Sequence, residues 1–401
     1  MSCEKCHQGI REFLPANVWV GRPISLLCAN LNEGMMLFVG RLGLLQRVFP
    51  SYRALFFDAL ASVCSGGLSL FAGQPLSTEG IATTTELRNA NYFPAHNLHF
   101  FNPQSPFYVC YQRGVLAWLE RENPDVLIVE ANFRYLSSPL AIDWMKRRGR
   151  PVVGWGLGAP TARGLLSVLR NRFLRQFDAL IAYSARGAEQ YADCGFPSER
   201  IFVAPNAVAP APKHALPERG DISSRPCVLF VGRLQARKRI PALLKACAAL
   251  PEPLQPRLVI VGDGPDRANV QSFAQSVYPA AEFVGAKHGA ELVPYFLAAD
   301  LFVLPGTGGL AVQEAMSYGL PVIVAQGDGT QSDLVRPENG WQIPPNDDSA
   351  LLFALQDALS DLPRLRRMGL ESYRIVAEEI NLEKMVRVFV DVLDFVQRSA
   401  R

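Results

Sequence analysis

The chain has 401 residues, of which 49% are apolar and 19% charged. This composition excludes disordered and fibrous proteins, and the length predicts two domains because it exceeds what one hydrophobic core ordinarily holds. The formal net charge of +3 is too small to indicate a nucleic-acid partner.

The eight cysteines are scattered and form no disulfide framework, which indicates a reducing compartment. No run of about eighteen apolar residues occurs, and the first residues lack the basic and apolar segments of a secretion signal. We therefore expect a cytoplasmic protein without a membrane-spanning helix.

Residues 1–37 read as an irregular extension, with a mispredicted start at Met35 or Met36 as the alternative. Cys3, Cys6 and His7 match the pattern of c-type haem attachment, but that chemistry needs export and no signal precedes the motif. A zinc site would need a second pair of ligands, and none is evident. We expect neither a cofactor nor a metal.

From residue 37 onward, short apolar runs alternate with longer amphipathic stretches, the pattern of β–α units around a parallel sheet. Strands are expected at residues 37–48, 67–72, 126–129, 151–155, 179–183 and 201–204. Helices are expected through Phe56, Leu60 and Val63 and at residues 114–121, 139–147 and 165–177, with residues 74–105 mainly loop. These elements predict a first Rossmann-like domain over residues 38–208.

Four prolines and few large apolar residues make residues 209–226 an interdomain linker. Strands are then expected at 228–231, 258–261, 282–284, 301–304 and 321–324, and helices at 240–250, 267–276, 291–298, 310–318 and 349–359. They predict a second Rossmann-like domain over residues 227–378. The last helix, within residues 379–401, follows a complete sheet and is expected to pack back toward the first domain.

Open parallel sheets bind ligands beyond the carboxyl ends of their strands. Gly232, Arg233 and Lys238 follow the strand at 228–231, where the glycine allows close approach and the two cations suit phosphate oxygens. Ordinary surface basicity is the alternative. Gly262 begins a Gly-Asp-Gly-Pro turn after the strand at 258–261, which taken alone is a weak signal.

Three glycines, among them Gly308 and Gly309, separate the strand at 301–304 from a helix that starts at Leu310. The free N–H groups and the dipole at such a helix start attract anions. Glu314 lies on the same helix, where a carboxylate can accept hydrogen bonds from ribose hydroxyls, as the acidic residue of a Rossmann fold does. An unrelated surface glutamate is the alternative.

These motifs resemble the retaining, GT-B-fold glycosyltransferases of family four. The family pattern G-R-L-x-x-x-K, a G-D-G-P turn and E-x7-E-A-x-x-x-G-x-P is met by residues 232–238, 262–265 and 314–321, followed by Asn339 and Gly340. The first half resembles the family more loosely. Its first loop corresponds to residues 49–53, its last strand to residues 182–184 and its domain crossing to residues 205–207. The resemblance covers about residues 38–398 and implies two Rossmann-like domains that face each other across a cleft.

The resemblance further implies that Arg233 and Lys238 hold the diphosphate of a nucleotide-sugar donor and Glu314 its ribose. Backbone N–H groups from Gly308 to Ala311 would assist, and the loop Gly285-Ala286-Lys287 would lie against the base. The enzyme would be a hexosyltransferase that retains the anomeric configuration. No D-x-D motif occurs, so we expect no metal ion between the phosphates.

Two positions depart from the family pattern. The first glutamate of E-x7-E, associated with the donor sugar, is Gly306 here, and Asp328, Thr330 or Asp333 could replace it. The family's common first-domain histidine is absent, and Glu130 is the nearest candidate to meet the acceptor hydroxyl, with a capping or linker-contacting carboxylate as the alternative. Tyr52, Arg53 and Asn132 complete the expected acceptor side.

Residues 145–175 carry eight lysines and arginines and no acid. Such a basic stretch indicates an anionic surface or substrate, or else an ordinary solvated face. Leu165, Leu169, Phe173 and Phe177 recur at helical spacing beside it, which would allow peripheral contact with the inner face of a membrane. A core-facing helix with basic edges is favoured, because Arg172 falls on the apolar side.

The expected acceptor is a saccharide, a lipid-linked saccharide or a small molecule, and the pathway is one of polysaccharide or glycolipid biosynthesis. A nucleotide-sugar epimerase is one alternative, although the five histidines at 7, 96, 99, 214 and 288 are poorly placed for acid–base work. A non-catalytic nucleotide-sugar-binding homologue is the other, prompted by Gly306. The sequence alone identifies neither sugar, base nor acceptor.

Overall fold

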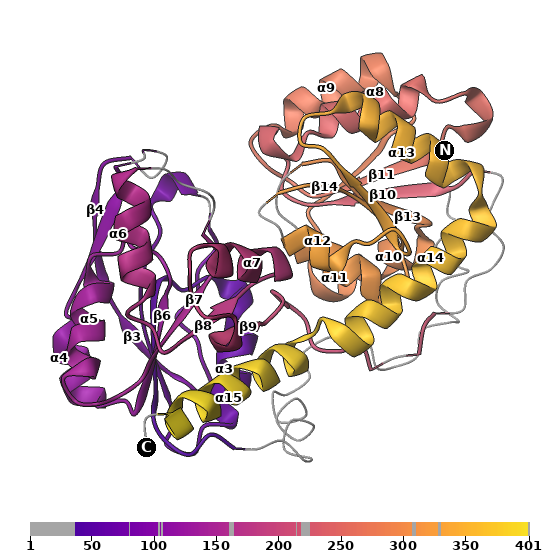
Figure 1. The fold of residues 1–401 in the computed structure, drawn as a ribbon. Helices are drawn as coiled ribbons and strands as arrows, with labels where there is room; N and C mark the ends of the chain where they lie inside the picture. Colours follow the sequence, from indigo (N-terminus) through magenta and orange to yellow (C-terminus); the bar gives the residue numbers. More distant parts are fainter. Residues whose placement is uncertain are drawn as a thin grey trace.

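Two α/β units connected by two chain crossings make up the computed structural model of the chain (Figure 1). It describes residues 37–399, except residues 80, 103–104, 106, 160–163, 214, 218–224, 307–309 and 328–329. The haem-like pattern at Cys3, Cys6 and His7 therefore lies outside the described residues, as do Gly308, Gly309 and Asp328.

The first unit is built on a seven-stranded parallel sheet with the order β3-β2-β1-β6-β7-β8-β9. Its strands are β1 (Leu42–Val48), β2 (Leu68–Gly73), β3 (Asn91–Pro94), β6 (Val126–Glu130), β7 (Val152–Gly156), β8 (Ala179–Ala182) and β9 (Ile201–Val203). The helices are α3 (Ala54–Ser62), α4 (Val115–Glu122), α5 (Ser137–Lys146), α6 (Leu165–Leu174) and α7 (Ala185–Asp193). The central strands are buried from end to end, as expected when helices cover both faces of a parallel sheet.

The start of the first strand was predicted wrongly, and short strands of this unit were missed. The first strand begins at Leu42, because the chain around Gly40 is an irregular segment that contacts residues 64–66. Residues 74–105 are mainly loop, as predicted, but they also contain two strands that were not predicted, β3 and β4 (His96–Phe100), and β4 forms an antiparallel hairpin with β5 (Val109–Arg113). Prolines and asparagines punctuate this stretch and disguise the strands.

The second unit has a six-stranded parallel sheet with the order β12-β11-β10-β13-β14-β15. Its strands are β10 (Cys227–Val231), β11 (Arg257–Val261), β12 (Glu282–Gly285), β13 (Leu301–Leu304), β14 (Val322–Ala325) and β15 (Gly340–Ile343). The helices are α8 (Ile240–Ala249), α9 (Arg267–Val277), α10 (Val293–Ala298), α11 (Leu310–Ser317), α12 (Thr330–Leu334), α13 (Asp348–Ser360) and α14 (Leu362–Arg374). The two parallel sheets confirm the predicted α/β fold class, although β15 and α14 were not predicted.

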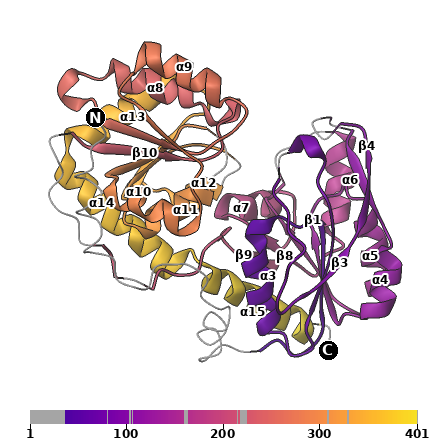
Figure 2. The same cartoon turned by 180° about the vertical axis from the view of Figure 1, so that it is seen from behind.

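The final helix α15 (Leu382–Ser399) runs from the second unit onto the first (Figure 2). Its buried side chains pack on α3 and the sheet, with Phe389 4.8 Å from Phe56 and 5.0 Å from Trp155, measured between ring centroids. One face of α15 is thus part of the core of the first unit, which fixes the direction in which the chain returns.

The two crossings of the chain meet at one buried glutamine. The Oε1 atom of Gln313 accepts a hydrogen bond from the N–H of Val208 (2.8 Å), and its Nε2 donates to the carbonyl of Ile380 (2.7 Å). The N–H of Leu382 also donates to the carbonyl of Ala209 (3.0 Å). The outgoing and returning segments are therefore joined to each other and to α11.

Candidate active site

Each sheet has one position where the strand order reverses, between β1 and β6 in the first and between β10 and β13 in the second. Connections leave such neighbouring strands in opposite directions, which opens a crevice at their carboxyl ends. Gly232 follows β10 and Pro305 follows β13, while Phe49 follows β1 and Ala131 follows β6. The segments that the sequence singled out lie at these two reversals.

A cavity of about 720 Å³ opens at the reversal of the second sheet. Seven of the predicted donor residues line it: Gly232, Arg233, Gly262, Ala286, Lys287, Ala311 and Glu314. Tyr52, expected on the acceptor side, reaches the same cavity from the first unit. The linker residues Val208, Ala209, Pro210 and Pro212 form a further wall, together with His288, Leu292 and Val293. No sequence signal marked the linker wall, because its side chains are small and apolar.

The backbone at the floor of this cavity is closely packed. Gly262 has a φ of +146°, and a Cβ atom there would lie 1.9 Å from the carbonyl oxygen of Gly232. The N–H of Gly262 donates to the carbonyl of Gly285 at 2.8 Å. Glycine is therefore required where the loops after β10, β11 and β12 touch, and Gly285 supports the cavity without lining it.

Two cations follow β10 in different environments. Arg233 is exposed and makes no ion pair with any residue that the structure describes, so its guanidinium is available at the cavity. Lys238 is only 9% exposed, and its stem passes beneath Gly232, whose added Cβ would lie 3.8 Å from Cε. Burial, aided by the nearby charge of Arg237, lowers the pKa of Lys238 to about 8. Lys238 does not line the cavity itself.

Glu314 extends from α11 into the cavity, and burial raises the pKa of its carboxyl. It lies just over one helical turn after Leu310, where α11 begins. Ala311 also lines the cavity, so the start of α11 is close to the place where an anion would be held. Among the described residues, no group of three or more His, Cys, Asp or Glu side chains is arranged to hold a metal ion.

Gly306 is packed directly against the turn that carries Lys238. A Cβ atom on Gly306 would lie 2.1 Å from the carbonyl oxygen of Arg237 and 2.6 Å from the Cα of Lys238. Backbone therefore occupies the place of the side chain that the family pattern would put here. Asp333, one of the candidates to replace that glutamate, contacts the first unit, since its Oδ2 accepts a hydrogen bond from the N–H of Ala185 (3.2 Å). Thr330 begins α12.

The first unit holds the predicted acceptor residues at its own strand reversal. Glu130 ends β6, and its Oε2 accepts a hydrogen bond from the N–H of Arg47 (2.8 Å), so it braces the end of β1. Burial raises the pKa of Glu130 to about 7, against the lowering effect of the Arg47 N–H. Asn132 accepts a hydrogen bond from the Arg134 N–H within a turn. Arg53 is buried, with 4% exposed.

Residues 145–175 do not present a continuous basic face. Lys146 pairs with Asp178, Arg147 with Asp143 and Arg148 with Glu120, all on the surface. The acidic partners lie outside residues 145–175, so a count of charges within that stretch does not include them. In α6, Leu169 is exposed while Phe173 and nearby Phe177 are buried, so the helix is half core-facing. No helix in the described part of the chain is both long and apolar enough to cross a membrane.

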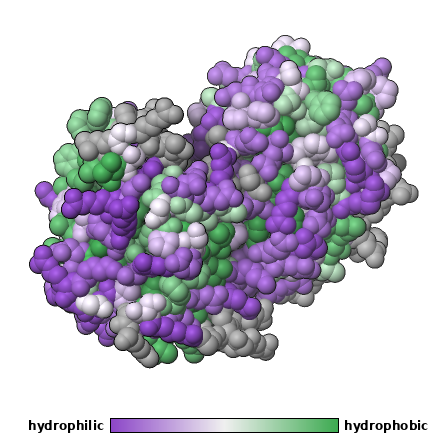
Figure 3. Space-filling model, viewed as in Figure 1, coloured by the Kyte–Doolittle hydropathy of each residue, from purple (hydrophilic) through white to green (hydrophobic). Residues whose placement is uncertain are grey.

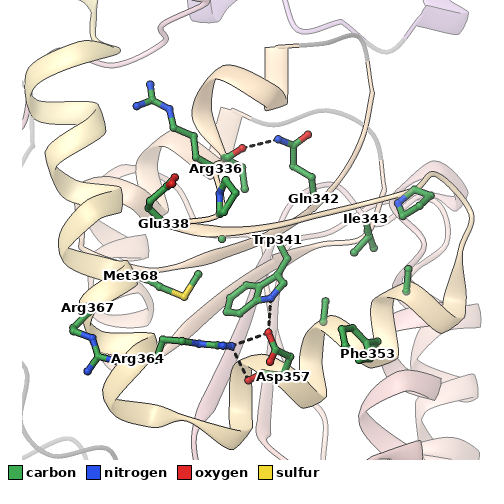
Figure 4. Close-up of a pocket in the computed structure, with 16 residues that line it drawn as sticks. Arg336, Glu338, Trp341, Gln342, Ile343, Phe353, Asp357, Arg364, Arg367 and Met368 are labelled. Carbon is green, nitrogen blue, oxygen red and sulfur yellow. Dashed lines mark hydrogen bonds and ion pairs between the residues drawn. The ribbon is translucent and has the colours of Figure 1, made fainter.

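A second cavity of about 710 Å³ lies beside the edge strand β15, between α13 and α14 (Figure 4). None of the predicted site residues lines it. Its central polar groups bind one another, since Asp357 accepts hydrogen bonds from Trp341 Nε1 (2.9 Å) and from Arg364 (2.7 Å). The arrangement braces α14 against the sheet, and the cavity at the reversal of the second sheet remains the candidate active site.

The two parallel α/β units and the cavity at a strand reversal define a class of fold, that of the GT-B glycosyltransferases. Residues 215–374 match the sequence model of the Glycosyl transferases group 1, and residues 73–207 match that of the Glycosyl transferase 4-like domain. The two matches cover most of the chain. The chain belongs to the Glycosyl transferases group 1 family, which confirms the resemblance seen in the sequence.

Individual relatives are similar over different lengths. The GDP-mannose-dependent alpha-mannosyltransferase of Mycobacterium tuberculosis is 41% identical over 140 residues, which are 34% of this chain and 34% of that protein. The lipopolysaccharide core biosynthesis glycosyltransferase LpsE of Rhizobium meliloti is 24% identical over 291 residues, 66% of this chain and 84% of that protein. The match spans about a third of the length of the mannosyltransferases.

The structure of Anabaena HepE in complex with UDP-glucose has a TM-score of 0.58 and 15% identity, over 90% of this chain and 99% of that one. Identity at this level establishes the fold alone. It confirms the prediction of two Rossmann-like units in the GT-B arrangement.

Proposed function

We propose that the protein transfers a hexose from a nucleotide diphosphate donor to an acceptor hydroxyl, with retention of the anomeric configuration. The observation that carries this proposal is the cavity at the reversal of the second sheet, where Arg233, Glu314 and the start of α11 lie together. The cation and the helix start can bind the diphosphate of such a donor, and the carboxylate can bind its ribose.

The hard step of this reaction is cleavage of the bond between the anomeric carbon and the phosphate oxygen. The electron pair leaves with the diphosphate, while the sugar becomes oxocarbenium-like. Arg233, Lys238 and the N–H groups at the start of α11 stabilise the growing negative charge more in the transition state than in the ground state. The acceptor oxygen forms the new bond, and its proton passes to the departing phosphate.

In this proposal Glu314 accepts hydrogen bonds from the ribose hydroxyls, and the loop at Ala286 and Lys287 lies against the base. Gly308, Gly309 and Leu310 contribute backbone N–H groups, and Gly285 and Gly262 keep the loops in place. The acceptor enters from the first unit, past Tyr52 and toward Glu130. Closure of the two units would exclude water and limit hydrolysis of the donor.

The names of similar proteins indicate which donors and acceptors to test first. One relative is named for GDP-mannose and another for lipopolysaccharide core biosynthesis, and HepE is seen with UDP-glucose. We propose a saccharide or lipid-linked acceptor in polysaccharide or glycolipid biosynthesis, and a cytoplasmic protein that contacts the inner face of a membrane. The supporting observation is the apolar surface near the start of α6, where Leu166, Val168 and Leu169 are exposed (Figure 3).

A thermal-unfolding screen across nucleotide sugars, including GDP-mannose and UDP-glucose, tests the donor. A donor at 100 times its Kd stabilises the fold by about 2.7 kcal/mol. The variant Arg233→Ala with Lys238→Ala is expected to lose this shift. Arg257→Ala is a matched control, because Arg257 pairs with Glu282 at the far edge of the sheet. An unchanged shift in the double variant would refute the site.

A donor found in the screen can then be used to distinguish the proposed transferase from a homologue that binds the donor without catalysis. Gly306 favours a non-catalytic nucleotide-sugar-binding homologue, because the carboxylate associated with the donor sugar has no room there. Binding of a donor without transfer to any acceptor in a glycan and glycolipid panel would support this alternative. Release of nucleoside diphosphate coupled to a glycosylated product would exclude it.

A further inference from the structure

Arg53 is a buried cation surrounded by aromatic rings. It ends a 3-10 turn (Ser51–Arg53) that follows β1, and only 4% of the residue is exposed. Its guanidinium carbon lies 4.7 Å from the ring centre of Trp155, 5.2 Å from that of Tyr183 and 5.4 Å from that of Tyr52. These rings hold the planar group in one orientation, since cation–π contacts favour stacking over the ring faces.

Arg53 has no oxygen partner among the residues that the structure describes. Its one hydrogen bond runs from Nη1 to the thioether sulfur of Met385 (3.8 Å), a weak acceptor. Arg47, a second arginine with little exposure in the same unit, instead makes two hydrogen bonds to Glu79, at 2.7 and 2.9 Å. A buried guanidinium whose N–H groups have no oxygen acceptor loses the hydrogen bonds that water would give it, so an oxygen ligand at Arg53 would be stabilising.

The nearest carboxyl group does not neutralise Arg53 by contact. Glu130 interacts with Arg53 only through space, and its Oε2 atom is occupied by the N–H of Arg47. Because burial raises the pKa of Glu130 to about 7, this carboxyl is partly neutral at neutral pH. The crevice at the reversal of the first sheet therefore keeps a positive charge.

Arg53 lies next to the cavity assigned to the donor. The ring of Tyr52 separates the two, since it faces the guanidinium on one side and lines the donor cavity. A group bound by Arg53 would thus be separated from the donor cavity by the side chain of Tyr52 alone. Five N–H groups in a planar fork match the two oxygens of a phosphate or a carboxylate.

We propose that Arg53 binds an anionic group, a phosphate or a carboxylate, carried by the acceptor. This assignment rests on the proposed glycosyltransferase function, because it takes the first unit as the acceptor side. It makes the acceptor an acidic saccharide or a phosphorylated molecule and excludes a neutral sugar as the preferred substrate.

The test uses inorganic phosphate and acetate as probes, each compared with chloride at equal ionic strength. Both are titrated into the Arg233→Ala, Lys238→Ala protein, in which the donor cations do not contribute. An anion at about ten times its Kd is expected to raise the Tm by about 3 °C. Phosphate acting more strongly indicates a phosphorylated acceptor, and acetate acting more strongly indicates a uronic acid. No shift with either anion overturns the proposal.

Two further substitutions, each added to the Arg233→Ala, Lys238→Ala protein, test whether the anion raises the Tm by binding to Arg53. Arg53→Met is expected to abolish it and to leave the Tm in chloride equal or higher, because a buried charge is replaced by an apolar side chain of similar length. Arg47→Met is the control: it is expected to lower the Tm in chloride, since Glu79 loses its partner, and to keep the anion shift. An anion shift that persists in Arg53→Met overturns the proposal.

If Arg53→Met does not fold, selenate diffused into crystals of the unmodified protein decides the matter: an anomalous peak beside Arg53 supports the site and its absence refutes it. Donor titration separates this proposal from the proposed function. Arg53→Met in the otherwise unmodified protein is expected to bind the nucleotide sugar within about twofold of the normal affinity. Loss of donor binding would place Arg53 in the donor site, and no donor binding by the unmodified protein would refute the function instead.

Discussion

If Lys238 holds the donor diphosphate, as proposed, donor binding is expected to depend on pH. Its pKa is about 8 in the free protein because burial disfavours the charged form. A bound diphosphate favours the ammonium and raises this pKa, so binding takes up a proton. With a pKa of 8 the lysine is about 90% charged at pH 7 and about 10% charged at pH 9. Affinity is therefore expected to be constant below pH 7 and about tenfold weaker at pH 9.

Isothermal titration calorimetry with the nucleotide sugar selected by the thermal screen measures this dependence. A nucleotide sugar carries no phosphate group that titrates between pH 6.5 and 9, so the slope reports the protein. Repeating the titration at pH 8 in two buffers of different ionisation enthalpy gives the proton uptake, expected to be about half a proton per site.

Two variants test whether Lys238 is the titrating group. Lys238→Arg keeps the charge at every pH, so its affinity is expected to stay constant up to pH 9. Lys238→Met keeps the length without the charge, and is expected to bind about 10- to 150-fold more weakly at pH 7, the equivalent of 1.5–3 kcal/mol for one charged hydrogen bond. A flat profile in the unmodified protein, or a slope that survives in Lys238→Arg, would show that the reasoning is wrong.

Three other substitutions probe the cavity and the contact between the units. Glu314→Gln is expected to raise the donor Kd by about 10- to 150-fold through loss of charged hydrogen bonds to ribose, and an unchanged Kd in calorimetry would contradict the role. Gly306→Glu is expected to lower the Tm by at least about 4 °C, because its side chain meets the Arg237 carbonyl; recovery of normal stability and faster transfer would contradict the packing. Asp333→Ala removes the hydrogen bond to Ala185 and is expected to increase the radius of gyration in small-angle scattering; superimposable curves would show that the contact does not hold the units together.

The sequence predicted the fold where strands are continuous apolar runs, and it missed elements whose formation depends on neighbours. β10 and β13 are buried except for the half-buried Val231, and a glycine or proline follows each, so their ends and the residues beyond them were clear. β4 has a half-buried, histidine-containing sequence that is stable only through its pairing with β5. α14 has a proline at its second position and is strongly polar, and it is held by its packing on α11 and α13.

The same difference, between local and long-range determinants, explains which site residues could be predicted. Arg233 and Glu314 could be placed because their distance from a strand end or helix start fixes their position. The partner of Asp333 could not, because Ala185 is 148 residues away in sequence and belongs to the other unit. The environment of Arg53 was equally hidden, since Met385, Trp155 and Tyr183 come from three separate segments.

Gln313 connects the crossings of the chain, and it is the residue directly before Glu314. Any rotation of one unit relative to the other must bend the segments at Val208 and Ile380, both of which are anchored to this side chain. The anchor of both crossings therefore lies in α11, the same helix that carries Glu314. If a nucleotide binds there as proposed, we expect its binding to be coupled to the angle between the two units, and therefore to the distance that the acceptor must cross.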